Sequence, residues 1–116
     1  MGDAIVTRPE VFLAATSKDA SFDSTMIFPL VGWESLSIQQ LITSAAGLTG
    51  SSILQTSIDK TNWDDYPGSS HSFTGNESFT WHLVQHTGAL WLKVMTTISS
   101  GSATFAQLAT GTKTIT

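Results

Sequence analysis

Residues 51–66 read SSILQTSIDKTNWDDY and hold the clearest folding signal in the chain. Residues 51–58 have the pattern of a short strand, with Ile53, Leu54 and Ile58 among Ser, Thr and Gln. Residues 59–62 then supply Asp and Asn, whose side chains hydrogen-bond their own backbone in turns. Trp63 and a short extended piece follow, ending at Pro67-Gly68. The stretch predicts a short strand, a polar turn and an aromatic anchor.

The preceding segment, residues 34–43 (ESLSIQQLIT), also predicts a strand. Leu36, Ile38 and Ile42 fall on one face, with Ser and Gln opposite, which is the period of two expected of a half-buried strand. A short helix is the alternative, because Gln, Leu and Ile are tolerable helix formers. The β-branched and Ser content of the segment favours the strand.

The segments that follow repeat this pattern. Residues 77–83 place Phe79, Trp81 and Leu83 on one face, and residues 90–98 alternate in the same way. Gly101 then reverses the chain into residues 102–109, because glycine tolerates the positive φ that tight turns require. These signals predict further short strands joined by turns.

The predicted fold is an all-β antiparallel β-sandwich of about seven to eight short strands, either jelly-roll-like or Ig-like. It rests on turn signals that recur every eight to twelve residues. Aromatic side chains each bury roughly 150–250 Å², so a few of them supply much of a small core. The expected core anchors are Trp63, Phe79, Trp81 and Phe105.

The N-terminal residues 1–22 are predicted to be an arm or an edge strand, and residues 23–116 a single sandwich domain. The apolar periodicity of residues 1–22 is weak, but they contain the run Val11-Phe12-Leu13, which is too apolar for a free tail. We therefore expect this segment to reach a neighbouring subunit and gain order on docking, instead of completing its own sandwich.

Composition narrows the classes of partner. A chain of 116 residues fits one domain, and without cysteine neither disulfides nor thiolate metal sites are available. The net charge is −4 and the five basic residues are scattered, whereas binding to nucleic acid needs them clustered. No segment approaches the ~20 apolar residues that span a membrane, and residues 1–6 do not indicate a signal peptide. We expect neither nucleic acid nor membrane as a partner.

Two polar groupings invite a metal-site interpretation. Four oxygen-bearing side chains within seven residues resemble calcium ligands, but a hairpin turn needs the same residue types: Asp59, Asn62, Asp64 and Asp65. His71, His82 and His86 suggest zinc, but the last two are spaced for a helix face in a region that predicts strand and loop. We favour a polar turn and surface histidines, with no metal and no cofactor.

An enzyme needs a nucleophile beside a base, or paired carboxylates in a cleft. Ser and Thr number 33, so their proximity to a histidine carries no information, and nothing like a nucleophile elbow occurs. We therefore expect no catalytic residues.

The segment from Leu54 to Trp63 resembles a pattern found in small structural proteins of tailed bacteriophages. In that pattern a strand ends in Leu-Gln-x-Ser-x-Asp, and a polar turn, Asn-Trp and an acidic Pro/Gly loop follow. The resemblance extends through Phe79-x-Trp81, through Trp91-Leu92-Lys93-Val94 and through residues 100–105, and covers roughly residues 35–109. This chain has Lys60-Thr61 where glycine often sits in the turn.

The resemblance implies a non-enzymatic virion component that is assembled in the bacterial cytoplasm. The leading role is capsid decoration or cementing, and the alternative is a tail or adaptor position. The expected partners are virion proteins, either the major capsid protein or tail proteins, together with further copies in a homo-oligomer. Carbohydrate binding by exposed aromatics is an alternative of a different class. The candidate interface residues are Val11, Phe12, Leu13, Trp33, Tyr66 and Trp91.

Overall fold

The computed structural model describes residues 4–24, 28–29, 35–83 and 91–115, and the side chains of residues 11–24, 35–83 and 91–111. All eight of its strands belong to one hydrogen-bonded sheet. The strands are β1 (Ala4–Lys18), β2 (Phe22–Asp23), β3 (Phe28–Pro29), β4 (Ser35–Ser57), β5 (Asp64–Asp65), β6 (His71–Phe73), β7 (Glu77–Leu83) and β8 (Trp91–Ile115). The described ranges include no helix long and apolar enough to cross a membrane. The predicted all-β class is confirmed.

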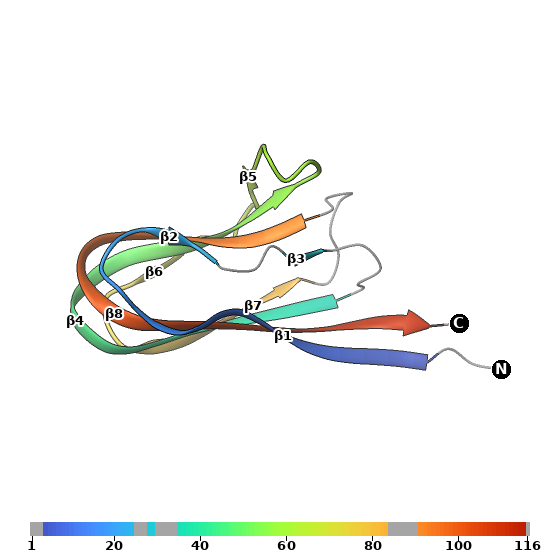
Figure 1. The fold of residues 1–116 in the computed structure, drawn as a ribbon, viewed down its shortest axis with the longest axis horizontal. Helices are drawn as coiled ribbons and strands as arrows, with labels where there is room; N and C mark the ends of the chain where they lie inside the picture. Colours follow the sequence, from blue (N-terminus) through green and yellow to red (C-terminus); the bar gives the residue numbers. More distant parts are fainter. Residues whose placement is uncertain (1–3, 25–27, 30–34, 84–90, 116) are drawn as a thin grey trace.

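Strands β4 and β8 form the spine of the molecule. They pair antiparallel along their whole length, from Ser35 opposite Thr112 to Ser57 opposite Trp91. Both strands turn back on themselves halfway, at the left of Figure 1, so each contributes to both layers of the sandwich. The two long strands replace four of the predicted short ones: residues 34–43 and 51–58 merge into β4, and residues 90–98 and 102–109 merge into β8.

The bend in the spine is built from residues with left-handed backbone. Ser44 and Gly47 in β4 have φ of 54° and 60°, and Gly101 in β8 has φ of 79°. The register between the strands shifts three times between Thr43 and Gly50. A Cβ atom on Gly101 would collide with the carbonyl oxygens of Ala46 and Gly47, so only glycine fits this crossing.

Each layer has the two spine strands at its centre. The β1/β7 layer contains β1, residues 103–115 of β8, residues 35–43 of β4, and β7, in that order. In the β2/β6 layer, β2 and β3 pair with residues 91–98 of β8. These residues pair in turn with residues 50–57 of β4, and β5 and β6 pair with the other side of β4. This is the strand order of a jelly roll, so of the two sandwich types left open by the sequence the structure has the jelly roll.

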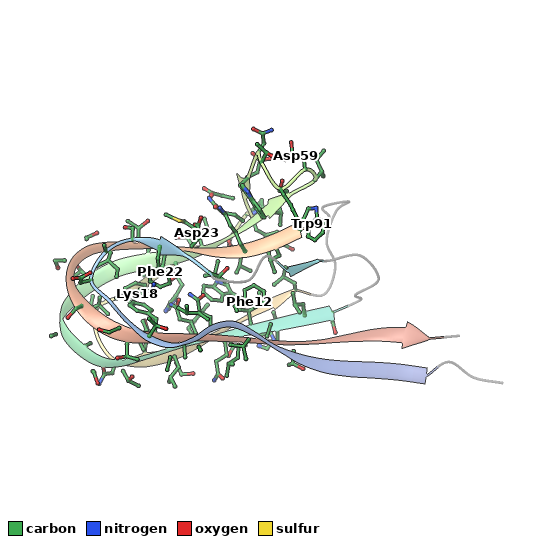
Figure 2. The ribbon with its side chains drawn as sticks, viewed as in Figure 1. Phe12, Lys18, Phe22, Asp23, Asp59 and Trp91 are labelled. Carbon is green, nitrogen blue, oxygen red and sulfur yellow. The ribbon has the colours of Figure 1, made fainter. Side chains whose placement is uncertain are left out.

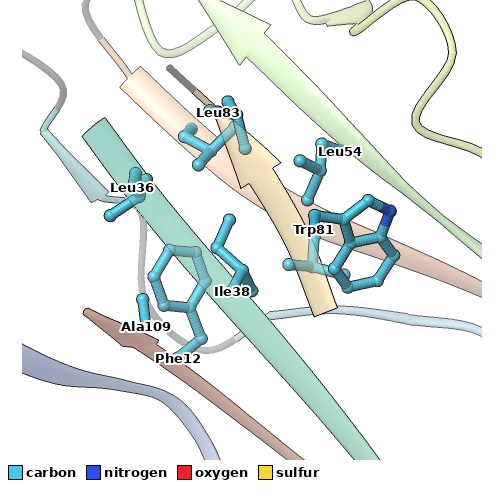
Figure 3. Close-up of a cluster of buried hydrophobic side chains, with 9 residues drawn as sticks. Phe12, Leu36, Ile38, Leu54, Trp81, Leu83 and Ala109 are labelled. Atoms are coloured by element: carbon cyan, nitrogen blue, oxygen red, sulfur yellow. The ribbon is translucent and has the colours of Figure 1, made fainter. Parts of the chain in front are cut away.

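The core between the layers consists of two apolar clusters. Trp81 is only 6% exposed, and its indole Nε1 donates to the backbone oxygen of Ser69 at 2.6 Å. Its burial, and that of Phe105, confirms two predicted anchors, while Phe79 is half-buried against the first cluster. The first cluster, shown in Figure 3, contains Phe12, Leu36, Ile38, Leu54, Trp81, Leu83, Leu92, Val94 and Ala109. The second contains Leu13, Ile42, Leu48, Phe73, Ala103 and Phe105.

A fully buried group of four polar side chains, Gln40, Ser52, Thr96 and Gln107, interrupts this apolar core; we call it the polar layer. The Oε1 of Gln40 accepts from Gln107 Nε2 at 2.8 Å and from Ser52 Oγ at 2.9 Å, and Ser52 Oγ lies 2.8 Å from Thr96 Oγ1. Among the described residues, Gln40 Nε2 and Gln107 Oε1 have no hydrogen-bond partner. The polar layer is therefore only partly satisfied.

The N-terminal segment is an edge strand of this same sandwich. Strand β1 pairs with β8 from Ala4 opposite Ile115 to Lys18 opposite Ala103, with a register shift between Val11 and Leu13. This irregularity lets two successive side chains point inward, so that Phe12 joins one cluster and Leu13 the other. The expectation of an arm that docks on a neighbour instead of completing this sandwich is wrong, because β1 pairs with β8 and buries Phe12 and Leu13 here, although Val11 stays exposed.

Candidate functional site

The loop between β4 and β5 is held in one shape by the side chain of Asp59. Its Oδ1 accepts from the backbone N–H of Thr61 at 2.9 Å and of Asn62 at 2.8 Å, and its Oδ2 accepts from Asn62 Nδ2 at 2.8 Å. Ser57 Oγ in turn accepts from the backbone N–H of Asp59 and Lys60. This is the Asx-rich turn that the sequence favoured over a calcium loop.

These contacts also stabilise the ionised form of the Asp59 carboxyl. The backbone N–H groups of Asn62 and Thr61, followed by the side chains of Asn62 and Ser57, hold the pKa of the Asp59 carboxyl well below its usual range. Lys60 takes the left-handed conformation, with φ of 64°, at the position where the phage pattern often has glycine. The carboxylate supplies the hydrogen bonds that keep a non-glycine residue in this unfavourable conformation.

Two cation–π contacts fasten the loop to the outer surface of the β2/β6 layer. Lys60 Nζ lies 3.9 Å from the ring centroid of Trp91 on β8, and Lys93 Nζ lies 4.6 Å from that of Trp63 in the loop. Trp63 Nε1 donates to the backbone oxygen of Lys60 at 3.2 Å. The loop lysine thus packs on a tryptophan of the sheet, and the sheet lysine packs on a tryptophan of the loop. Each contact contributes about 0.5–1 kcal/mol at an exposed site.

An ion pair extends this cluster to β2, where Lys93 Nζ contacts Asp23 Oδ2 at 2.9 Å. At the start of the loop, the aliphatic side chain of Ile58 is 69% exposed. Figure 2 labels two members of this surface, Asp23 and Trp91, together with Asp59, which orders the adjoining loop. We call it the loop face and define it as Asp23, Ile58, Lys60, Trp63, Trp91 and Lys93.

The outer surface of the other layer has a different chemistry. Its central row runs across four paired strands, through Val11, Leu108, Gln39 and Thr80. These residues border a shallow hollow of about 480 Å³, which Ser37, Ala109 and Thr110 also line. We call this surface the neutral face and define it by its outward side chains: Val11, Ser37, Gln39, Leu41, Thr43, Ser78, Thr80, His82, Thr104, Ala106, Leu108 and Thr110.

The structure distributes the candidate interface residues over several environments. Val11 lies on the neutral face, Tyr66 packs against the first apolar cluster, and Trp91 belongs to the loop face. Phe12 and Leu13 are in the core. Trp33 lies outside the described residues. The five described candidates therefore do not form one surface.

Trp63 corrects another prediction. It was expected to anchor the core, but it is half-buried on the loop face, beneath the ammonium group of Lys93. Ile58, Lys60 and Lys93, which also belong to the loop face, were not among the candidate residues. The alternation of Trp91, Lys93 and Met95 against Leu92, Val94 and Thr96 was the signal that pointed to an outward Lys93 beside Trp91.

The two described histidines, His71 and His82, make local contacts. His71 Nε2 lies 3.1 Å from both carboxylate oxygens of Glu77, and its ring stacks on Phe79 with centroids 3.7 Å apart. His82 Nδ1 lies 2.9 Å from Ser37 Oγ, whereas His86 is outside the described residues. The described part of the chain contains no group of three or more His, Cys, Asp or Glu side chains that could hold a metal ion.

No protein-family model matches this chain, and no curated protein matches it by sequence. Solved structures share its fold. The SPBc2 prophage-derived protein YomS superposes with a TM-score of 0.62 at 13% sequence identity, over 95% of this chain and 96% of YomS. At this identity the likeness establishes the shared fold alone.

Two further structures come from infectious bursal disease virus. The structure of the Gx strain gives a TM-score of 0.54 and that of the virus-derived T=1 particles 0.58, each at 12% identity. Each match covers 98% of this chain but only 34% and 32% of the viral chains, so this chain spans about a third of their length. The same fold thus extends over nearly the whole YomS chain and over about a third of each longer viral chain.

Proposed function

We propose that this protein is a non-enzymatic structural protein of a bacteriophage particle, which decorates or cements the head shell by binding other virion proteins. The observation that carries the proposal is the end-to-end likeness of the jelly roll to YomS, a prophage-derived protein of nearly the same extent. The resemblance of residues 35–109 to small phage structural proteins supports the same reading independently. The likeness to part of a chain from viral T=1 particles is consistent with it.

The loop face is the surface that we assign to the shell contact. Its Asp59 hydrogen bonds and two cation–π contacts order the loop before any partner arrives. A pre-ordered surface loses less conformational entropy on binding than a mobile one. Tryptophan is enriched in interface hot spots, and Ile58, in the same loop as Trp63, has an exposed aliphatic side chain.

The same geometry argues against carbohydrate binding. A sugar ring stacks on an open aromatic face, but in this structure an ammonium group lies over the ring of both Trp63 and Trp91. A stacked sugar would have to displace a lysine or use the opposite side of the ring. The loop face is better suited to a protein partner, for which lysine and tryptophan together form one contact surface.

The test is to add the purified protein to phage head shells that lack it, and to measure binding and shell resistance to heat. We expect saturable binding at a fixed ratio to the shell protein, with a higher temperature of shell disruption. Ile58→Lys should weaken the binding strongly, whereas Thr97→Lys, on the same layer but outside the loop face, serves as the matched control.

Three outcomes would contradict this assignment. Binding to tails but not to heads would place the protein in the tail or in an adaptor. Binding to a glycan array without binding to shells would favour the carbohydrate-binding alternative. Equal binding by Ile58→Lys and Thr97→Lys would show that the shell contacts another surface.

A further inference from the structure

We infer that the neutral face is a self-association surface, on which two copies of the chain pack face to face. This goes beyond the proposed function, because it concerns a contact between isolated copies and needs no shell. The partner is a second copy, and the contact is isologous, with the same patch used on both sides. The argument rests on the charge, the exposed aliphatic residues, the hydrogen bonding and the area of the face.

The first argument is the distribution of charge. The chain carries a net charge of −4, so most arrangements of two copies bring like charges together. None of the twelve side chains that define the neutral face is Asp, Glu, Lys or Arg. The loop face, on the opposite side of the sandwich, has Asp23, Lys60 and Lys93. The neutral face can therefore meet its own copy without opposing like charges.

The second argument is the placement of exposed aliphatic residues. The described part of the chain has four large hydrophobic side chains that are strongly exposed, and three of them lie on this face: Val11 at 52%, Leu108 at 46% and Leu41 at 44%. Val11 and Leu108 are direct cross-strand partners, and Leu41 lies on the adjacent strand opposite Ala106. They form a contiguous apolar stripe that a second copy would cover.

The third argument concerns the cost of removing water from the polar groups. Gln39 Nε2 donates to Ser78 Oγ at 2.9 Å, and Ser37 Oγ lies 2.9 Å from His82 Nδ1. These pairs join β4 to β7 across the face, so part of their hydrogen bonding is already satisfied within one copy. Burying a paired polar group costs much less than burying an unpaired one.

The area of the face determines the expected strength. Outward residues on paired strands are about 4.8 Å apart across the sheet and about 6.7 Å apart along a strand, so twelve of them cover roughly 400 Å². A standard stable interface buries about 800 Å² on each partner. The contact therefore has about half the size of a stable dimer interface and should be weak and reversible. In an ordered assembly, repeated weak contacts of this kind reinforce one another.

The test is analytical ultracentrifugation of the isolated protein, from micromolar to nearly millimolar concentration. We expect the weight-average mass of the parent to rise toward that of a dimer. Leu108→Lys should stay monomeric, because it introduces one charge from each copy into the contact. Ile58→Lys makes the same chemical change on the loop face and should associate like the parent. Circular dichroism melts establish that each variant is folded, and Leu41→Lys replaces Leu108→Lys if that variant does not fold.

A parent protein that stays monomeric over the whole range overturns the inference. So does association by Leu108→Lys equal to that of the parent, or loss of association in Ile58→Lys. Failure of the proposed function looks different, because shell binding would then be absent while the concentration-dependent mass of the isolated protein is unchanged.

Discussion

Replacing both glutamines of the polar layer by leucine should not destabilise the protein, although replacing either one alone should. Gln40 and Gln107 are opposite each other on β4 and β8, fully buried, and joined by a hydrogen bond of 2.8 Å. Gln40→Leu removes the acceptor of this bond and leaves Gln107 Nε2 with only a 3.5 Å contact to Thr96. A buried polar group left unpaired costs about 1–3 kcal/mol, which is the loss that we expect in each single variant.

The double variant removes both amides together. The two amide atoms that already lack a partner disappear, and Ser52 and Thr96 keep their mutual hydrogen bond at 2.8 Å. Leucine is similar to glutamine in volume and joins the two apolar clusters. The free energy of unfolding should therefore equal or exceed that of the parent, so the two substitutions should be non-additive by roughly 2–6 kcal/mol, which is twice the expected single loss.

Urea unfolding followed by tryptophan fluorescence measures these differences, and unchanged m-values would show that the same surface is exposed in each variant. Gln39→Leu is the matched control: it changes the neighbouring glutamine, which points outward, and should alter stability by no more than about 0.5 kcal/mol. A double variant that loses the sum of the two single losses would refute the reasoning, because the polar layer would then be a net source of stability.

Three further predictions concern the core, the loop and β1. Trp81→Ala should lower the free energy of unfolding by about 3–5 kcal/mol, seen as a lower urea midpoint; an unchanged midpoint would place Trp81 outside the core. Folding lowers the pKa of the Asp59 carboxyl, so the ionised carboxylate stabilises the folded state. This stabilisation is complete above the ordinary carboxyl pKa, which is near 4, and is lost as the pH falls further. The indole N–H signal of Trp63 should therefore keep its neutral-pH position down to pH 4 in the parent. In Asp59→Ala it should be displaced at both pH values, because no carboxylate then holds the loop; a parent signal that moves by pH 4 would contradict this. A chain starting at Ser21 lacks β1 and should lose its cooperative melt; a cooperative melt would show that β1 is dispensable.

The alternation of residues along the strands could be predicted from the sequence because each layer is covered on one side only. Leu36, Ile38 and Ile42 point inward as expected, and the same parity places Gln40 between them. The sequence thus contained the signal for a buried amide, although polarity alone suggests a surface position for glutamine. Trp81 was predictable for the same reason, because it shares its parity with Leu83.

The bends and the N-terminal edge could not be predicted in this way. Gly47 and Gly101 have the positive φ of turn residues, and a bend within a long strand has the same local sequence signature as a turn between two short strands. What distinguishes them is the partner strand, which continues through the bend. The burial of both Phe12 and Leu13 depends on a register shift of β1 against β8. Two successive inward side chains depart from the simple alternation on which a strand prediction relies.

The chemical difference between the loop face and the neutral face follows from one feature of the spine. In β8 the inward residues are even-numbered before the bend, as in Leu92 and Val94, and odd-numbered after it, as in Phe105 and Gln107. The parity changes at the bend around Gly101, whereas in β4 the inward residues Leu36, Ile38 and Leu54 are even-numbered on both sides of the bend. A slip of one residue turns every side chain of a strand to the opposite face. The bend therefore has two separate effects, because it folds the sheet into two layers and also places Lys93 and Leu108, two side chains of one strand, on opposite outer surfaces of the sandwich.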